Sequence, residues 1–140
     1  MATTRVLNLK TEQWTQGPNM KQYKRQHSCF YDEKTNSIFT IGGLSGSDKS
    51  ATTEQWKLDT NQWESTPSLP EPLWSAAGVA SNSMDYIGFV AGGSTNSGGS
   101  DKVLGLRRMD LVWQVIPQKL KTARSWHSIL NLPLDQIPGC

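Results

Sequence analysis

Short apolar segments alternate with polar turns along the chain, and none of them sustains the 3.6-residue period of a helix. The segments 37–41 and 86–91 each run directly into a pair of glycines. Short apolar runs bounded by turn residues predict β-strands. We therefore expect an all-β fold, with strands over 4–9, 27–31, 37–41, 53–59, 62–64, 74–81, 86–91, 102–109, 112–116 and 126–132.

The pattern repeats about every fifty residues. The two glycine pairs are 50 residues apart, and three tryptophans follow one another at intervals of 49 and 50 residues. A proline stands four residues after each of these tryptophans. A fixed period of this length indicates a repeat architecture. The positions that mark it are Gly42, Gly43, Gly92, Gly93, Trp14, Trp63 and Trp113.

This arrangement resembles the kelch repeat, in which four strands form one blade of a β-propeller. The resemblance rests on the glycine pair after the second strand, the tryptophan on the fourth strand, and the segment 53–63 with Trp56 and Trp63. It implies one partial kelch region over residues 1–140, with the first strand of each blade innermost. Its parts are the last two strands of a blade (1–16), two complete blades (25–66 and 74–116) and the first strand of a further blade (126–132).

Two complete blades and two partial ones do not close a ring, because a propeller contains about 4 to 8 blades. We therefore expect a fragment or short isoform of a longer protein, or a chain that completes its ring with another chain. Open apolar blade faces favour self-association over a stable lone monomer. The recurring tryptophans are expected to pack in the core between blades.

The composition agrees with one soluble domain. The chain has 140 residues, of which 36% are hydrophobic and 19% are charged, and its formal net charge is +2. That charge is too small to favour nucleic acid as a partner. No apolar run is long enough for a membrane helix, and residues 1–5 show no signal peptide, so we expect a cytoplasmic protein without a membrane partner. Two cysteines make no disulfide framework.

No motif for catalysis, a metal or a cofactor is recognised in the sequence. His27 and His127 occupy matching repeat positions, which favours a structural role over a catalytic or metal-binding one. Copper-radical oxidases share a propeller with kelch-like repeats, but they need a tyrosine crosslinked to a cysteine. Cys29 falls in a strand expected to be buried and is a poor candidate. We expect no enzyme activity and no cofactor.

The charged loops give the candidate binding site. The family geometry implies that the linkers 17–26, 66–74 and 117–126 share a rim with the loops after the glycine pairs. Two of these linkers are basic, which favours an acidic peptide segment of a partner protein. The family pattern also places Arg25 and Arg124 before an inner strand. The candidate residues are Lys21, Lys24, Arg25, Trp74, Lys121, Arg124 and Trp126. Solvated lysines, structural arginines and half-buried packing tryptophans are the alternatives.

The function favoured by the sequence is a protein-interaction module that holds a partner protein on this rim. The resemblance implies two finer roles, a substrate receptor of a cullin ubiquitin ligase and a cytoskeletal or actin scaffold. The alternative is a fragment of a galactose-oxidase-like propeller enzyme. A third hypothesis is a truncated chain without a separate function.

Overall fold

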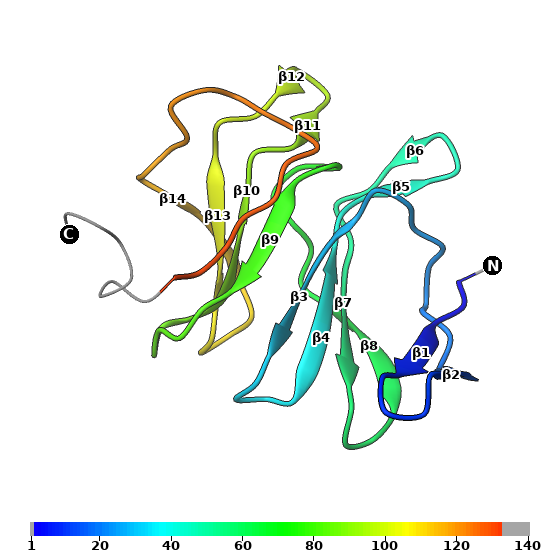
Figure 1. Cartoon of the computed structure of the whole chain (residues 1–140). Helices are drawn as coiled ribbons and strands as arrows, with labels where there is room; N and C mark the ends of the chain where they lie inside the picture. The colour runs from blue at the N-terminus through cyan, green and yellow to red at the C-terminus, as the bar shows by residue number, and fades with distance from the viewer. Residues whose placement is uncertain (1, 133–140) are drawn as a thin grey trace.

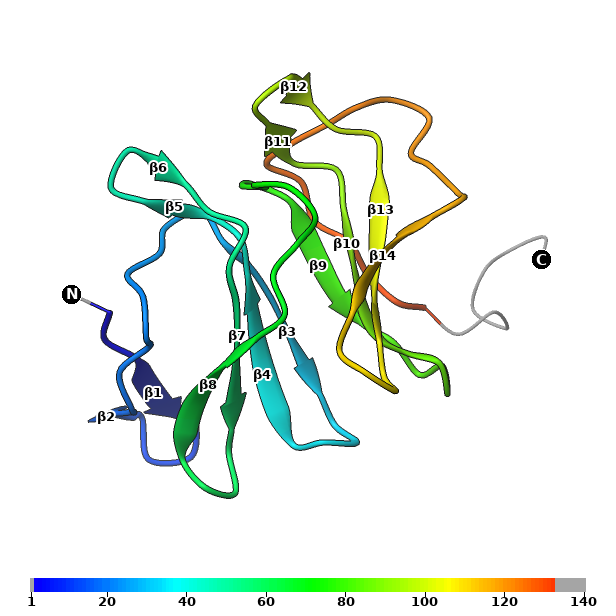
Figure 2. The same ribbon diagram turned by 180° about the vertical axis from the view of Figure 1, so that it is seen from behind.

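The computed structural model describes residues 2–132, which form strands and loops without a helix. Figure 1 shows two antiparallel sheets of four strands standing side by side, and Figure 2 shows the same pair from behind. The strand orders are β3-β4-β7-β8 and β9-β10-β13-β14. The bounds are Ser28–Asp32 (β3), Ser37–Ile41 (β4), Thr53–Lys57 (β7), Gln62–Thr66 (β8), Ala77–Ala80 (β9), Tyr86–Ala91 (β10), Val103–Arg107 (β13) and Trp113–Ile116 (β14). The prediction of an all-β fold with kelch-type blades in an incomplete ring is confirmed.

A separate hairpin, β1 (Arg5–Asn8) with β2 (Gln13–Gln16), packs against the first sheet. The indole N–H of Trp63 connects the two, because it lies 3.2 Å from both Thr4 Oγ1 and the carbonyl oxygen of Pro18. The residues that flank the hairpin therefore contact the first sheet at Trp63 of β8.

The glycine- and serine-rich loops contain two further hairpins that the sequence did not predict. β5 (Leu44–Ser45) pairs with β6 (Asp48–Lys49), and β11 (Ser94–Thr95) pairs with β12 (Gly98–Gly99). Glycines with φ of 64° at Gly46 and 118° at Gly98 permit the tight turns. Their composition resembles that of an irregular connector, and for that reason no strand was expected there.

Apolar side chains fill the space between the two sheets. Phe30 and Phe39 of the first sheet stack with ring centroids 5.4 Å apart and share one buried cluster with Val90 of the second sheet. Phe30 approaches the second sheet at Gly88, where an added Cβ would lie 2.6 Å from Phe30 Cζ. Close stacking of the blades therefore depends on a residue without a side chain at position 88.

The glycine pairs bring each linker against the preceding sheet. Gly43 N–H donates to the carbonyl of Leu73 at 2.8 Å, and Gly93 N–H donates to that of Arg124 at 2.7 Å. Both glycines have positive φ, 98° and 90°, which an L-residue with a side chain rarely adopts. The pairs thus fix where the chain leaves one sheet and enters the next.

A second set of backbone hydrogen bonds joins corresponding residues of consecutive repeats. Ser75 N–H donates to the carbonyl of Gln26, and Trp126 N–H donates to that of Ser75, both at 2.9 Å. All three residues have positive φ, between 55° and 58°. Gln26, Ser75 and Trp126 are therefore equivalent positions of the repeat.

The strand predicted over 126–132 is wrong, because no strand is assigned to these residues. The segment lies beside β9 (Figure 1), and Asn131 Nδ2 donates to the carbonyl of Ala80 at 3.3 Å. A strand needs a ladder of backbone bonds with a neighbour. No hairpin partner for this segment exists within residues 2–132.

The prediction that all three recurring tryptophans are core residues holds for two of them. Trp63 and Trp113 are buried, with 6% and 5% of their surface exposed, whereas Trp14 is 64% exposed. Trp14 lies on the β1–β2 hairpin, and residues 2–132 provide no sheet on its outer side. A tryptophan is buried in this fold only where a neighbouring element covers it.

A buried ion pair joins the linker 17–26 to the first sheet. Lys24 Nζ lies 3.3 Å from Glu54 Oε1, and their side chains are 0% and 2% exposed. Burial lowers the pKa of Lys24, although the Glu54 carboxylate acts in the opposite direction. Glu54 also accepts hydrogen bonds from the backbone N–H groups of Lys21 and Gln22.

In the next repeat, apolar residues form the contact between the linker and the sheet. Leu73 and Leu104 stand at the positions of Lys24 and Glu54, and both are buried. Pro70, which has no N–H group, stands at the position of Lys21. The chain therefore contains an ionic and an apolar version of one contact.

A second ion pair connects the two sheets. The guanidinium of Arg108 donates to both carboxylate oxygens of Asp32, at 3.1 and 3.2 Å, and to the carbonyl of Tyr86. Burial alone would raise the pKa of Asp32, but hydrogen bonds from Arg108 and Thr35, with the charge of Arg108, hold it below its ordinary value.

We predict that Glu54→Leu alone destabilises the protein by about 3–5 kcal/mol, because it leaves the Lys24 ammonium buried without a counter-ion. The double variant Lys24→Leu with Glu54→Leu reproduces the residues of the next repeat and is expected to regain most of that loss. Urea unfolding measures both values. A double variant no more stable than the single one contradicts the equivalence of the two contacts.

We also predict that the bond between Asp32 and Arg108 makes stability sensitive to acid. Because the folded pKa of Asp32 is depressed, its contribution is complete above the unfolded value of about 3.9 and is lost as the pH falls through the folded value. Asp32→Asn should lower the free energy of unfolding at neutral pH and flatten its decline between about pH 5 and pH 2. The exposed Asp48→Asn is the matched control, and an equal flattening in that variant contradicts the assignment.

Candidate functional site

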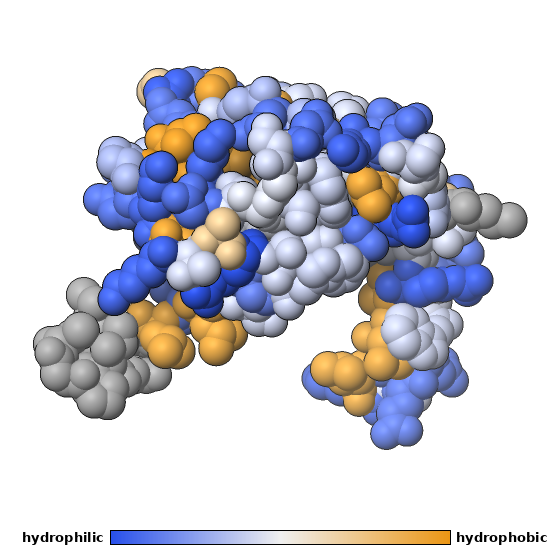
Figure 3. Space-filling view, turned by 90° about the horizontal axis from the view of Figure 1, so that it is seen from above, coloured by the Kyte–Doolittle hydropathy of each residue, from blue (hydrophilic) through white to orange (hydrophobic). Residues whose placement is uncertain are grey.

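The linkers and the glycine loops meet at one end of the sheets. We call this surface the rim, and it consists of residues 17–26, 42–52, 66–74, 92–102 and 117–126. Arg25 forms an isolated antiparallel bridge with Leu44, and Trp74 forms one with Ser94. The linkers and the short hairpins therefore form a continuous surface. The view from above (Figure 3) shows mainly polar residues, with apolar residues in separate patches.

Four of the predicted basic residues, Lys21, Arg25, Lys121 and Arg124, are exposed on the rim. Arg25 Nη2 donates to the carbonyl of Gly46 at 3.0 Å, which holds this side chain along the β5–β6 hairpin. None of the four forms a salt bridge with a described residue. They provide positive charge that is not neutralised within residues 2–132.

Lys24 must be removed from the predicted site. Its side chain is fully buried and paired with Glu54, and it also donates to the carbonyl of Thr52. A lysine at this repeat position replaces a buried leucine, so its charge is directed into the structure. Thr53, Glu54 and Gln55 are consecutive polar residues of β7, so the sequence pattern did not indicate that Glu54 is buried with a charged partner.

Arg25 and Arg124 do not occupy equivalent positions, which corrects the alignment that the resemblance implied. Arg25 exchanges backbone hydrogen bonds with Leu44, as Trp74 does with Ser94. The carbonyl of Arg124 instead accepts from Gly93, as that of Leu73 accepts from Gly43. The two arginines therefore reach the rim from different positions of the repeat.

The two predicted rim tryptophans differ in their surroundings. Trp74 is partly buried, and Lys49 Nζ lies 5.0 Å from the centre of its ring, a cation–π geometry. Trp126 is 72% exposed. Lys49 is not among the predicted residues, because the predicted cations come from the linkers and not from the loops after the glycine pairs. It adds a fifth cation that has no salt bridge with a described residue.

Acidic residues neutralise only part of this charge. Glu71 pairs with Lys102 at 2.6 Å, and Asp101 pairs with Lys119 at 3.7 Å. Asp48 is the one rim carboxylate, among the residues that the structure describes, outside these ion pairs and the Lys24 pair. The rim thus carries an excess of positive charge, and its acidic side chains are mostly engaged.

The two histidines pack beside glycines. A Cβ added to Gly92 would lie 2.6 Å from His127 Cε1, and one added to Gly43 would lie 3.0 Å from His27 Cβ. Burial lowers the pKa of His27, with Lys24 acting in the same direction. The structure contains no group of three His, Cys, Asp or Glu side chains that could hold a metal ion within the part it describes.

Cys29 is exposed, which corrects the expectation of a buried strand residue. β3 alternates between buried and exposed positions, and Cys29 lies on the side away from the second sheet. The period of a strand predicts that buried and exposed residues alternate along β3, but it does not indicate which face of the sheet is left exposed.

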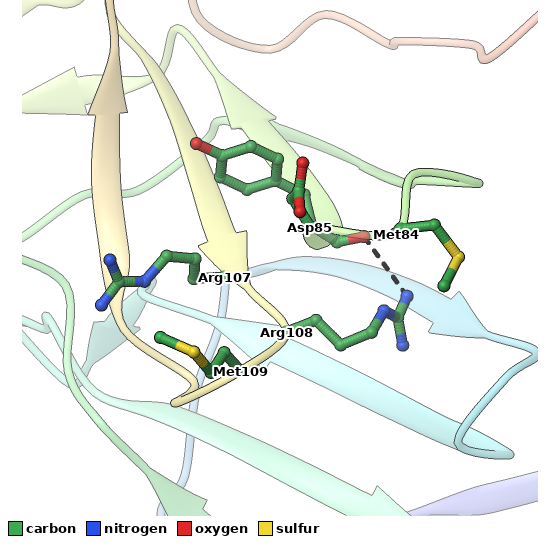
Figure 4. A pocket seen from close by; sticks show the side chains of 6 residues that line it. Met84, Asp85, Arg107, Arg108 and Met109 are labelled. Atoms are coloured by element: carbon green, nitrogen blue, oxygen red, sulfur yellow. Dashed lines mark hydrogen bonds between the residues drawn. The ribbon is translucent and has the colours of Figure 1, made fainter.

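A pocket of about 390 Å³ lies at the opposite end of the second sheet, between the turns that follow β9 and β13. Figure 4 shows Met84 and Met109 on either side of Arg108, whose dashed bond leads to the backbone beside Asp85. Arg108 is engaged with Asp32, and Arg107 is engaged with Asp110. Neither arginine of this pocket offers an unpaired charge, so the rim remains the stronger candidate.

The part of the chain that the structure describes contains no helix long and apolar enough to cross a membrane.

Comparisons with known proteins agree with the fold. The family model of the Kelch motif matches residues 35–70, which include β4, the glycine pair, β7 and β8. A RING finger domain and kelch repeat-containing protein of Dictyostelium discoideum is 27% identical over 135 residues, which cover 94% of this chain and 13% of that protein.

Two proteins of Limulus polyphemus are also similar. Alpha-scruin is 33% identical over 98 residues, covering 69% of this chain and 10% of its own length, and beta-scruin is 32% identical over 88 residues, covering 61% and 9%. The chain thus spans about a tenth of the length of the curated relatives it matches. With its two four-stranded blades and its paired glycine turns, the chain is a kelch-repeat protein.

Proposed function

We propose that this chain is a protein-interaction module that binds an acidic peptide segment of a partner protein on its rim. The cations of this site are Lys21, Arg25, Lys49, Lys121 and Arg124. The mechanism is binding without chemistry. The kelch repeats and the kelch-repeat relatives support an interaction module as the general class.

The observation that carries the proposal is the charge balance of the rim. Five exposed cations lie outside the salt bridges of the described residues, against the single free carboxylate of Asp48. An acidic segment supplies the missing counter-charges and is attracted before contact. Arginine additionally offers two parallel N–H groups to one carboxylate.

The tryptophans supply the apolar part of the contact. Trp74 is held in place beneath Lys49, and Trp126 projects into solvent. Tryptophan is enriched among residues that dominate binding energy, because it buries much area at a small entropic cost. A partner segment with an apolar residue among its acidic ones fits this surface best.

Finer roles follow from the family resemblance and belong to the same proposal. A substrate receptor of a cullin ubiquitin ligase and a cytoskeletal or actin scaffold both need a surface that holds another protein. A cytoplasmic location is consistent with either role. No specific observation favours the alternative of a galactose-oxidase-like fragment.

We predict that Arg25→Glu with Arg124→Glu weakens binding of a fluorescent hexaglutamate peptide about tenfold or more, because each reversal replaces an attraction by a repulsion. Fluorescence anisotropy measures the affinity. The salt dependence of binding should also fall, since fewer charge contacts remain to be screened.

The control must change the net charge equally at the other end of the sheets. Lys10→Glu, Thr60→Glu and Gln62→Glu together lower the charge by the same amount, in two turns and at the first residue of β8, all remote from the rim. Equal loss of binding in both proteins means that only net charge matters, and it contradicts the proposed site. Unchanged binding in the rim variant contradicts it as well.

A further inference from the structure

Two exposed methionines line the pocket of about 390 Å³ that lies at the end of the second sheet remote from the rim. Met84 belongs to the turn after β9 and Met109 to the turn after β13 (Figure 4), and they are 81% and 84% exposed. Methionine is an adaptable apolar side chain and is common at surfaces that bind other proteins. Two of them at one pocket indicate a contact with an apolar group.

The place of this pocket in the repeat follows from a backbone hydrogen bond. Arg108 N–H donates to the carbonyl of Asp85 at 2.7 Å, as Leu58 N–H donates to that of Asn36 at 3.1 Å in the first sheet. The two bonds align the turns of one sheet with those of the other. The corresponding residues are Thr35 and Met84, Asn36 and Asp85, and Asp59 and Met109.

The two turns of the first sheet are polar and are joined to each other. Nδ2 of Asn36 donates a hydrogen bond to Oδ1 of Asp59 across the gap between them. In the second sheet the carboxylate of Asp85 and the thioether of Met109 cannot form this bond, because neither group has a hydrogen to donate. The pocket therefore lies where the first sheet has a hydrogen bond between its turns.

The exposure of the two methionines belongs to their position in the repeat. Thr35 and Asp59 of the first sheet are exposed as well, although the second sheet packs against that sheet. A neighbouring sheet therefore does not cover this end of the turns. Apolar side chains at positions that stay exposed between packed sheets indicate an interaction with another molecule.

The charges at the pocket favour a basic partner. Its two arginines are each paired with an aspartate, whereas the exposed carboxylate of Asp85 forms no salt bridge with a described residue. The ammonium of Lys34 donates to the carbonyls of Asn82 and Ser83 beside the pocket, and the adjacent Glu33 carries the opposite charge. One negative charge thus remains next to the methionines, and a positive charge on the partner complements it.

The backbone at the pocket favours a helix as the occupant. The carbonyls of Asp85 and Tyr86 both accept hydrogen bonds from Arg108. An extended strand needs backbone partners, whereas a helix satisfies most of its own N–H and C=O groups. A helix also places side chains four positions apart on one face, so that an apolar residue and a basic one can reach the site together.

We infer that this pocket is a second binding site, and that it takes a basic amphipathic helix of a partner protein. A leucine of the helix enters between Met84 and Met109, and a lysine or arginine one turn away pairs with Asp85. The site lies at the opposite end of the sheets from the rim and prefers the opposite charge. The inference does not depend on the cations of the rim.

The test uses the whole chain and two synthetic peptides of about 18 residues, a length at which an isolated helix forms in water. Both have leucine at every third or fourth position among alanines, and the charged positions are lysine in one peptide and glutamate in the other. NMR spectra of protein isotope-labelled at the methionine methyl groups report the contact. We expect the lysine peptide to shift the signals of Met84 and Met109 but not that of Met20 in the linker 17–26, and the glutamate peptide to shift neither pocket signal.

Protein variants test the apolar and the charged part of the site separately. Met84→Thr with Met109→Asn gives the turns the polarity of the first sheet and should weaken binding of the lysine peptide about tenfold or more, because the leucine loses its apolar contacts. Asp85→Asn should weaken it about threefold and lower its salt dependence. Asp59→Asn removes the same charge from the corresponding turn of the first sheet and is the matched control. All these residues are exposed, and a dispersed NMR spectrum verifies that each variant is folded.

Several results would overturn the inference. They are a lack of binding by the lysine peptide, binding that shifts neither pocket methionine, and equal shifts with the glutamate peptide. Unchanged affinity in the methionine variant, or equal losses with Asp85→Asn and Asp59→Asn, overturns it as well. If the signals of Met84 and Met109 shift with protein concentration in the absence of peptide, a second copy of the chain is the occupant and the inference is wrong.

Discussion

Each sheet of this fold has two faces, and neither face can be buried without a neighbour. That constraint accounts for most of what the structure shows. Glycines at 78 and 88 admit Phe30, and glycines at 43 and 93 receive the linkers, so that one sheet comes close enough to cover the next. Side chains are exposed where no neighbouring sheet packs on them. Trp14 is exposed although the equivalent Trp63 and Trp113 are buried, and Cys29 is exposed at the position that Gly78 occupies in the second sheet.

The two repeats meet this constraint with different chemistry. One linker contact is an ion pair between Lys24 and Glu54, and its counterpart joins Leu73 and Leu104. Because a buried ion pair is weak support for stability by itself, the ionic version distinguishes the first sheet more than it strengthens it. The bond between Asp32 and Arg108 likewise joins these two particular sheets, since Ser81 and Leu58 stand at the equivalent positions. The repeats are alike in backbone and distinct in their contacts.

Periodicity was sufficient to predict the architecture, because glycine pairs, tryptophans and turns recur in phase and each has a local physical cause. It predicted nine strand regions correctly in type and erred at 126–132, where a strand depends on a partner that the described residues lack. The residues that form the rim could be predicted from the same periodicity only in part. The burial of Lys24, the contribution of Lys49 and the different positions of Arg25 and Arg124 depend on side-chain contacts and hydrogen-bond register, which spacing in the sequence does not encode.

The proposed function depends on which surface of the protein binds the partner. Hydrogen exchange of the whole chain, measured with and without the hexaglutamate peptide, tests it directly, since a bound segment slows exchange of the amides it covers. The account predicts slower exchange in the β5–β6 hairpin and in the linkers around Arg25, Trp74 and Arg124, with little change in the turns at the other end of the sheets. Slower exchange confined to those turns, or spread evenly over the chain, contradicts it.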